Sequence, residues 1–194
     1  GYDLILVASR KEKLEDTKKL CKSNVNIIEL DLNIEKNVYK LYEKTKDKNI
    51  DILVNNAGFG LFGHFTETDL DTELNMIDLN IKTVHTLTKL FLKDFKKRDS
   101  GYILNVASSA AFAPGPLMAT YYSTKSYVFR LTESIYRELK QKKYKSKVMK
   151  KYQFKTTMKC DHCVAKVREK LDAVAEIAHW EVDLKSPNRI LIVE

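Results

Sequence analysis

Short apolar runs alternate with amphipathic stretches through residues 1–144, and this alternation limits the fold more than any other feature. Leu4–Ala8 is a continuous apolar run, as expected of a parallel strand that is buried on both faces. The predicted strands are Leu4–Ala8, Val25–Leu30, Ile50–Asn55 and Tyr102–Ala107, and the predicted helices are Lys11–Cys21, Ile34–Lys46, Asp69–Lys96 and Ala119–Lys142. Strands that alternate with helices of this length predict right-handed crossovers and an α/β fold with a doubly wound parallel sheet.

The pattern changes after residue 144. Gln141–Lys155 holds seven lysines and no acidic residue, and we interpret residues 145–150 as an exposed junction between two domains. The elements predicted beyond the junction are a half-exposed strand at Tyr152–Thr157, a helix at Cys160–Val174 and a hairpin of Ile177–Leu184 with Ile190–Val193. Residues 151–194 are therefore predicted to form a small βαββ unit of ferredoxin-like type.

Composition and charge exclude several classes of protein. The net charge is +8, but the basic residues are spread among acidic ones, so a solvated surface explains the excess and no nucleic-acid partner is expected. Gly101–Thr124 carries no charge, yet its asparagine, serines and prolines favour a buried strand and a loop over a membrane span. Three cysteines are too few for a disulfide framework. With no visible signal peptide, we expect a soluble, cytoplasmic protein without a membrane partner.

Tyr121 and Lys125 form a Y-x-x-x-K pattern near the start of a predicted helix, where they share one face. An ammonium group one turn away stabilises a phenolate, so it makes the tyrosine usable as a general acid or base. Ser108 lies thirteen residues earlier, just past a predicted strand. The carboxyl edge of parallel strands is where open α/β sheets bind ligands. The pattern therefore indicates a catalytic site at this edge.

Four segments of residues 1–144 together resemble the short-chain dehydrogenase/reductase family. They are Asn55-Asn56-Ala57-Gly58, Asp78-Leu79-Asn80, Asn105-Val106-Ala107-Ser108-Ser109 and Tyr121-Tyr122-Ser123-Thr124-Lys125. The resemblance implies that Tyr121 exchanges a proton with the substrate oxygen and that Ser108 hydrogen-bonds the same oxygen. It implies that Lys125 lowers the pKa of the tyrosine and binds the nicotinamide ribose, and that Asn80 holds a water connecting Lys125 to solvent. Hydride transfer would belong to the cofactor.

The end of the first predicted strand indicates the cofactor type. An acidic residue there would bind the ribose hydroxyls of NAD, whereas this chain has Ser9-Arg10-Lys11. A guanidinium suits a 2′-phosphate, which favours NADP(H), although Arg10 could instead cap a surface turn. Asp31 matches the family's contact to the adenine amino group. The implied cofactor-binding residues are Ser9, Arg10, Asp31, Asn55, Ala57, Gly58, Tyr121 and Lys125.

Two family elements are not found in the sequence. None of the six glycines forms the family's T-G-x-x-x-G-x-G turn, which presents backbone N–H groups to the pyrophosphate. We also expect the strand that follows the Tyr121 helix to be missing. Without the strand that carries the glycine turn, its two neighbours would keep unpaired edges and leave an incomplete Rossmann-type sheet. We therefore expect weak NADP(H) binding and impaired activity.

The carboxyl-terminal unit contains Met158-Lys159-Cys160-Asp161-His162-Cys163, and over residues 151–194 it resembles part of a heavy-metal-associated domain. Two thiolates at the spacing of Cys160 and Cys163 can reach one soft ion. Cu(I) is the first expectation, with Zn(II) if His162 or another molecule adds ligands. A redox pair and a non-functional remnant are the alternatives, and Cys21 is expected to be a buried small residue.

The sequence thus predicts an NADP(H)-dependent oxidoreductase of the carbonyl reductase or alcohol dehydrogenase type. Its substrate would be a small-molecule carbonyl compound or alcohol, and homo-oligomer formation is left open. The alternative is a soft-metal binding module carried on a non-catalytic reductase fragment.

Overall fold

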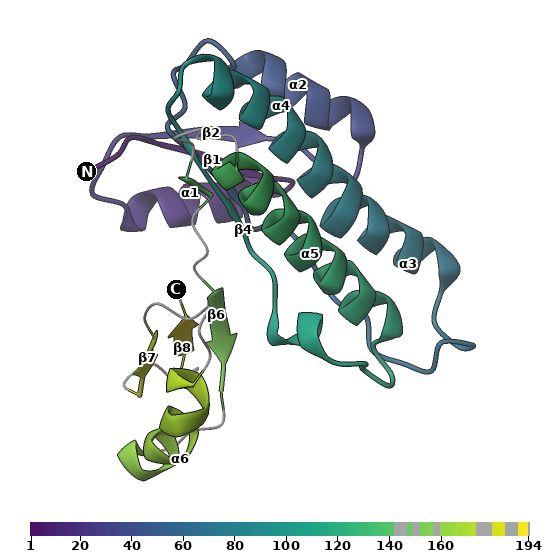
Figure 1. Cartoon of the computed structure of the whole chain (residues 1–194). Coiled ribbons are helices and arrows are strands. Elements are labelled where there is room, and N and C mark those ends of the chain that lie inside the picture. The colour runs from purple at the N-terminus through teal and green to yellow at the C-terminus, as the bar shows by residue number, and fades with distance from the viewer. Residues whose placement is uncertain (142–146, 149–151, 157–159, 174–179, 185–189, 194) are drawn as a thin grey trace.

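The computed structural model of the chain describes residues 1–141, 147–148, 152–156, 160–173, 180–184 and 190–193 (Figure 1). The strands of the first domain are β1 (Leu4–Ala8), β2 (Val25–Glu29), β3 (Ile52–Asn55), β4 (Tyr102–Asn105) and β5 (Lys147–Val148). Its helices are α1 (Lys11–Leu20), α2 (Glu35–Thr45), α3 (Leu70–Ile77), α4 (Val84–Lys97) and α5 (Ala119–Gln141), with a π-helical turn η1 (Asp78–Thr83) and a 3-10 turn η2 (Ser109–Phe112). The predicted alternation of strands and helices is confirmed.

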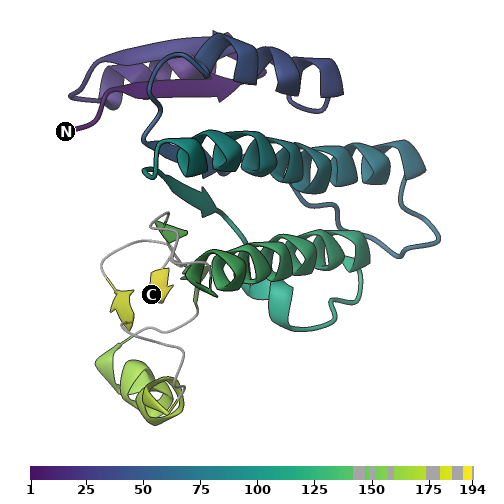
Figure 2. The same ribbon diagram turned by 45° about the horizontal axis from the view of Figure 1, so that its top comes forward.

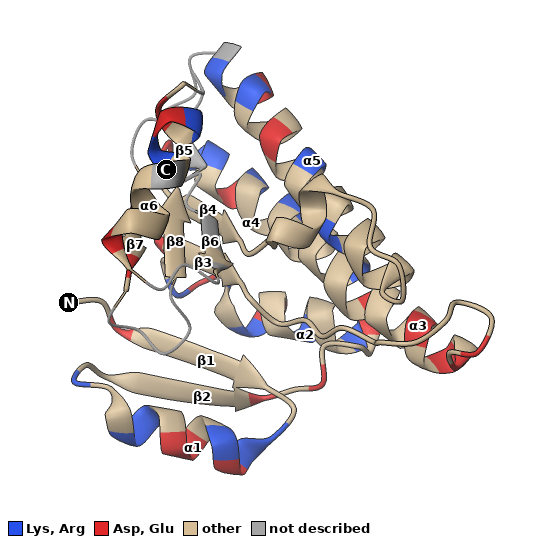
Figure 3. Cartoon of the chain, turned by 90° about the horizontal axis from the view of Figure 1, so that it is seen from below, with Lys and Arg blue, Asp and Glu red and all other residues tan. Residues whose placement is uncertain are grey.

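The parallel strands form two sheets rather than the single incomplete sheet that we expected. One sheet pairs β1 with β2 from Leu4↔Val25 onward, and the other has the order β3-β4-β5. Figure 3 shows β1 and β2 side by side, apart from β3 and β4. Within the described residues no backbone pairing joins β1 to β3, and Val54 of β3 is 52% exposed. Both strands therefore present an open edge.

The strand after α5, which we expected to be missing, is present in a short form. Lys147 and Val148 of β5 pair in parallel with Tyr102 and Ile103 of β4. Our expectation was wrong because one lysine and one valine within a lysine-rich segment make no apolar run. This part of the lysine-rich segment contributes to the parallel sheet.

A hydrophobic core fills the space between α2, α4 and the strands. Its buried members are Leu30, Leu32, Val38, Leu41, Leu87, Phe91, Phe95 and Ile103. A Cβ on Gly101, before β4, would lie 2.3 Å from the Phe95 ring, and this glycine has φ +138°. Only glycine fits such a backbone position. The residue that ends the loop after α4 thus lets β4 approach that helix closely.

The long helix predicted over Asp69–Lys96 is continuous from α3 through η1 to α4. Asp69 caps it, because its carboxylate accepts a hydrogen bond from the Thr72 N–H at 2.8 Å. Figures 1 and 2 show this rod running side by side with α5, and η1 lies against α5. The π-helical turn within the rod was not predicted.

The carboxyl-terminal unit contains β6 (Tyr152–Lys155), α6 (Asp161–Asp172), β7 (Trp180–Asp183) and β8 (Ile190–Val193). The order of its elements is the predicted βαββ, and the antiparallel sheet has the order β6-β8-β7. Trp180 Nε1 donates a hydrogen bond to Asp172 at 2.7 Å, which ties β7 to α6. Met158 and the turn predicted at residues 186–189 lie outside the described residues. None of the described helices has the length and apolar character needed to cross a bilayer.

Candidate active site

Tyr121 and Lys125 lie in the first two turns of α5, as the sequence predicted. The Lys125 side chain is buried, and its Nζ donates a hydrogen bond to the carbonyl oxygen of Val106 at 3.0 Å. The same Nζ lies 5.9 Å from the centroid of the Tyr121 ring. Burial lowers the pKa of Lys125 from its ordinary value of 10.5, because desolvation disfavours the charged form. A buried cation is therefore held between the tyrosine ring and the end of β4.

Asn80 lies in the π-helical turn and is 1% exposed. Its Nδ2 donates to the carbonyl oxygen of Phe59 at 2.9 Å and to Thr124 Oγ1 at 3.1 Å, while its Oδ1 accepts from the Phe59 N–H at 3.1 Å. A π-helical turn inside an α-helix is frequent at functional sites. Through Asn80, this π-helical turn is hydrogen-bonded both to the loop after β3 and to α5, the helix of Tyr121.

Gly58 completes the contact between these elements. A Cβ at this position would lie 2.8 Å from Asn80 Oδ1 and 3.6 Å from Lys125 Nζ. A larger residue would push into the asparagine and crowd the ammonium group. The structure therefore brings together Gly58, Asn80 and Lys125, three residues that are far apart in the sequence.

Ser108 follows β4 and is the N-cap of η2. Its Oγ accepts a hydrogen bond from the Ala110 N–H at 3.2 Å. The turn after it is fastened to α5, because Ser126 Oγ donates to the carbonyl oxygen of Ala111 at 3.0 Å. Ser108 thus lies in a loop that packs on the helix of Tyr121 and Lys125.

Two glycines that the sequence analysis did not single out shape the surroundings of the tyrosine. A Cβ on Gly60 would lie 3.1 Å from the Tyr121 ring, and a Cβ on Gly115 would lie 2.3 Å from the Tyr122 ring. Close approach of two segments requires glycine at both places. For Gly60, the sequence does contain a signal of this close approach, because three glycines follow one strand at positions 58, 60 and 63.

A buried network of amides and hydroxyls lies beneath the site, and the sequence analysis did not find it. Asn55 Nδ2 donates to Asn105 Oδ1 at 2.8 Å and to Thr88 Oγ1 at 3.1 Å. Asn105 Nδ2 donates to Thr132 Oγ1 at 2.9 Å. The network joins the ends of β3 and β4 to α4 and α5. Asn55, which we expected to contact the cofactor, uses its side-chain amide here. The signal was an asparagine at the end of each of two strands.

The remaining predicted cofactor residues lie on the other sheet or on the exposed turn after β3. Ser9 and Arg10 are exposed at the end of β1, and Ala57 and Gly58 are exposed after β3. Asp31 follows β2, and its Oδ1 accepts hydrogen bonds from the backbone N–H of Asn33 at 3.0 Å and from its side chain at 3.1 Å. These positions lie at the carboxyl ends of parallel strands, where such sheets bind ligands.

The two cysteines of the small unit lie at the start of α6. Cys160 is exposed and is the N-cap of the helix, and Cys163 lies one turn later. Their sulfur atoms are 3.7 Å apart. Among the described residues, no group of three or more His, Cys, Asp or Glu side chains is placed to hold a metal ion. The described chain therefore offers two sulfur ligands at this place.

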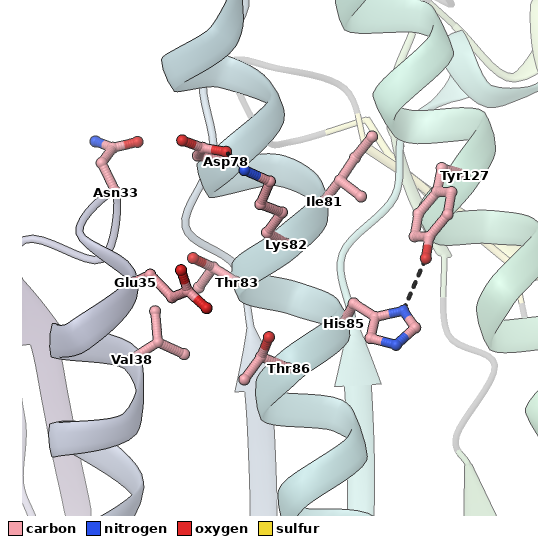
Figure 4. Close-up of a pocket in the computed structure, with 10 residues that line it drawn as sticks. All are labelled: Asn33, Glu35, Val38, Asp78, Ile81, Lys82, Thr83, His85, Thr86 and Tyr127. Atoms are coloured by element: carbon pink, nitrogen blue, oxygen red, sulfur yellow. Dashed lines mark hydrogen bonds and ion pairs between the residues drawn. The ribbon is translucent and has the colours of Figure 1, made fainter.

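A cavity of about 440 Å³ lies over α2, η1, α4 and α5 (Figure 4). Its lining residues are Asn33, Glu35, Val38, Asp78, Ile81, Lys82, Thr83, His85, Thr86 and Tyr127. None of these residues belongs to the predicted catalytic set. His85 Nδ1 and the Tyr127 hydroxyl are 2.7 Å apart and join α4 to α5. We therefore do not take this cavity as the candidate active site.

A family model described as short chain dehydrogenase matches residues 1–162. The chain belongs to this family. As a short-chain dehydrogenase, the chain is an oxidoreductase by descent, and the match extends past the boundary that we predicted at residue 144.

Curated relatives are similar to this short-chain dehydrogenase over part of their length. The human 17-beta-hydroxysteroid dehydrogenase type 3 is 31% identical over 165 residues, which cover 81% of this chain and 53% of the relative. An uncharacterized oxidoreductase of Staphylococcus epidermidis is 30% identical over 142 residues, covering 72% of this chain and 61% of the relative. The rat very-long-chain 3-oxoacyl-CoA reductase is 27% identical, covering 73% and 48%. The chain thus spans between about half and three fifths of the length of these relatives.

Solved structures agree with the fold of a short-chain dehydrogenase. A bulky-bulky ketone specific alcohol dehydrogenase from Comamonas testosteroni is 27% identical with a TM-score of 0.67, covering 73% of this chain and 59% of that one. A short-chain dehydrogenase from Sphingobium yanoikuyae in complex with NADPH is 28% identical with a TM-score of 0.67, covering 73% and 57%.

Proposed function

We propose that the chain is the catalytic part of an NADP(H)-dependent carbonyl reductase or alcohol dehydrogenase. The observation that carries the proposal is the arrangement of Gly58, Asn80 and Lys125 beside Tyr121. Asn80 hydrogen-bonds Phe59 and Thr124, which are the chain neighbours of Gly58 and Lys125, and the Lys125 Nζ lies 5.9 Å from the centroid of the Tyr121 ring. A buried ammonium beside a tyrosine is what a proton donor to a carbonyl oxygen requires.

The residues present fit the two ends of a nicotinamide cofactor, and we still expect weak binding because none of the six glycines forms the turn for its pyrophosphate. A glycine at position 58 leaves one side of the Lys125 ammonium open, since a Cβ there would lie 3.6 Å from Nζ. Arg10 is exposed at the end of β1, where it can bind a 2′-phosphate by two parallel hydrogen bonds. Asp31 and Ala57 would lie toward the adenine and the central part of the cofactor. When bound, NADPH supplies the hydride.

The chain's own residues would handle the proton and the substrate oxygen. Tyr121 gives its hydroxyl proton to the carbonyl oxygen during reduction, and Ser108 donates a hydrogen bond to the same oxygen. Lys125 stabilises the phenolate that Tyr121 becomes, and it orients the ribose. Asn80 holds the loop after β3 in place through Phe59 and, by resemblance to the family, the water that returns a proton to Lys125.

The names of the relatives favour a large apolar ketone or alcohol as substrate. The matched proteins include a hydroxysteroid dehydrogenase, a very-long-chain 3-oxoacyl-CoA reductase and a bulky-bulky ketone specific alcohol dehydrogenase. A panel of steroid, acyl and diaryl ketones with NADPH, followed at the nicotinamide absorbance, tests the activity. The proposal would be contradicted if the chain binds NADPH, as measured by fluorescence, but consumes no NADPH with any of the ketones.

Cofactor choice is tested by Arg10→Ala with Lys11→Ala as the matched control on the neighbouring exposed residue. Charge-assisted hydrogen bonds contribute about 1.5–3 kcal/mol each, so losing one weakens NADPH binding by roughly tenfold to a hundredfold. NADH binding should not change, because NADH lacks the 2′-phosphate. An equal loss for both cofactors would mean that Arg10 only caps α1.

A second candidate function is soft-metal binding by Cys160 and Cys163, favoured by their sulfur separation of 3.7 Å. With metal–sulfur bonds of about 2.3 Å, two thiolates of a tetrahedral site lie about 3.8 Å apart. Cu(I) or Zn(II) would then complete its coordination with His162 or with a second molecule. Cu(I) and Zn(II) titrations of the full chain against Cys160→Ser/Cys163→Ser test this, with Cys21→Ser as the control. Equal uptake by all three proteins would contradict it.

A further inference from the structure

Glu73 of α3 is a buried carboxylate, 8% exposed, in the middle of the first domain. Glutamate is almost never fully buried unless its charge is satisfied. Two threonine hydroxyls do so here, since Thr120 Oγ1 donates to Oε2 at 2.7 Å and Thr68 Oγ1 donates to Oε1. Each oxygen of the Glu73 side chain thus accepts a hydrogen bond from a different threonine.

These two threonines belong to different elements on either side of the candidate site. Thr68 lies in the loop that leads from the turn after β3 into α3, and Thr120 is the residue before Tyr121 in α5. The same loop is fastened to the segment before α5 a second time, because the Gly63 N–H donates to the carbonyl oxygen of Leu117 at 2.8 Å. Glu73 therefore links α3, the loop and the first turn of α5.

The first turn of α5 decides where Tyr121 lies. A carboxylate close to a helix N-terminus is favourable, because the unpaired N–H groups there carry partial positive charge. Tyr121 packs on Gly60, Tyr122 packs on Gly115, and Thr120 is held by Glu73. Three successive side chains of this turn are thus each fixed by a different neighbour, and the neighbour of Thr120 is the charged one.

We propose that Glu73 is a positioning residue for the acid/base tyrosine, acting on Tyr121 through the Thr120 hydroxyl. This inference rests on the proposed reductase function for its catalytic consequence. It predicts that loss of the contact lets the first turn of α5 shift, which moves the Tyr121 hydroxyl relative to Lys125. A misplacement of about 1 Å in such a site costs on the order of a hundredfold in rate.

The experiment compares four variants of the full chain with one control. Glu73→Ala and Thr120→Val remove the contact, whereas Glu73→Gln and Thr120→Ser keep an acceptor and a hydroxyl at the same places. Asp71→Asn, an exposed acid on the same helix, is the control. We expect kcat to fall roughly tenfold to a hundredfold in the first two variants with the KM for NADPH unchanged. The two conservative variants and the control should keep kcat near that of the unaltered chain.

A double-mutant cycle tests whether the two residues act as one unit. Glu73→Ala combined with Thr120→Val should lower kcat no further than Glu73→Ala does alone, because Glu73→Ala already removes the contact with Thr120. Additive losses would mean that Glu73 does not act through Thr120, and the inference would be wrong.

A second readout needs no catalysis. The Tyr121 ring resonance of ¹³C-tyrosine-labelled chain is assigned with Tyr121→Phe, and Tyr136 further along α5 serves as the internal reference. We expect the Tyr121 resonance to shift or broaden in Thr120→Val while that of Tyr136 stays unchanged. If no ketone is reduced by the unaltered chain, the proposed function fails but this measurement still decides the inference. An unchanged Tyr121 resonance in Thr120→Val, even if Glu73→Ala unfolds the chain, would show that Glu73 serves stability only.

Discussion

The candidate site residues in the two halves of the first domain have different surroundings. In the half built on β3, β4 and α5, Asn80 and Lys125 are buried, and their side chains hydrogen-bond Thr124 and the carbonyl oxygen of Val106. In the half built on β1 and β2, Ser9 and Arg10 are exposed, and Asp31 makes local hydrogen bonds to Asn33. Proton chemistry needs fixed distances, whereas cofactor selection needs an open charged surface. The residues that we propose for proton transfer therefore all lie in one half.

Hydrogen bonds between the halves come from the loop after β2 and from α2. Thr83 Oγ1 donates to the carbonyl oxygen of Leu32 at 2.7 Å, and the Tyr42 hydroxyl donates to Asp94 at 2.6 Å. Changes within the catalytic half should therefore affect activity or stability strongly, while changes across the boundary should have smaller effects.

The largest effect is expected for Tyr121→Phe. Loss of a positioned general acid costs on the order of a hundredfold to ten-thousandfold in rate. NADPH binding should remain, because the hydroxyl acts on the substrate oxygen. Steady-state reduction of a ketone measures the change, with Tyr122→Phe as the neighbouring control. If Tyr121→Phe keeps the full rate, another group supplies the proton.

The second largest effect is expected for Asn105→Ala, measured as the free energy of unfolding in urea. The change removes the hydrogen bonds of Asn105 to Asn55, Thr88 and Thr132, and each such bond contributes about 0.5–1.5 kcal/mol. Asn75→Ala, at an exposed position on α3, is the control and should cost little. Equal losses in the two variants would show that the network adds nothing to the stability of the catalytic half.

A smaller effect is expected where Tyr42 crosses between the halves. Its hydrogen bond to Asp94 raises the pKa of Tyr42 from 10.0 to about 12. The bond therefore stabilises the fold fully below pH 10.0 and is lost as the pH rises toward 12. We expect Tyr42→Phe to cost about 1 kcal/mol at neutral pH and nothing above the raised pKa.

Urea unfolding of Tyr42→Phe at several pH values measures this, with the exposed Tyr39→Phe as the control. A cost that does not change with pH would mean that packing, and not the hydrogen bond, carries the contact.

The smallest effect concerns Lys125 and is confined to alkaline solution. Because its folded-state pKa lies below 10.5, the unfolded chain binds more protons between the lowered pKa and 10.5. The unaltered chain should therefore gain stability relative to Lys125→Met as the pH rises through that window. Thermal unfolding of both proteins across the window measures the difference. A constant difference would show that the charged side chain is not desolvated.

Periodicity predicted most of the elements because burial decides them. Leu4–Ala8 is a strand at the predicted bounds, but its five residues are only partly buried, so the expected burial on both faces is not met. The short β5 was not predicted, because Lys147–Val148 gains its pairing from β4 and not from its own composition. Tertiary contacts of this kind leave no local pattern.

The candidate site was predictable where chemistry dictates residue types at fixed spacing, as for Tyr121 and Lys125. Supporting residues such as Glu73 and Asn105 were missed. An acid in a helix and an asparagine at a strand end are both common on surfaces, and only the fold shows that these two are buried. The hydrogen bond between Thr120 and Glu73 also joins residues that are 47 positions apart in the sequence, and no local pattern predicts such a contact.

The π-helical turn at Asp78–Thr83 has a consequence for how this helix can change in length. Such a turn accommodates one extra residue, and each residue of an α-helix advances the side chains by about 100°. Deleting one residue there would give a regular helix while rotating α3 relative to α4. Glu73 and Asn80 could then no longer both face α5. Selection for the reaction should therefore preserve the extra residue, and descendants that abandon catalysis are expected to lose it by a single-codon deletion.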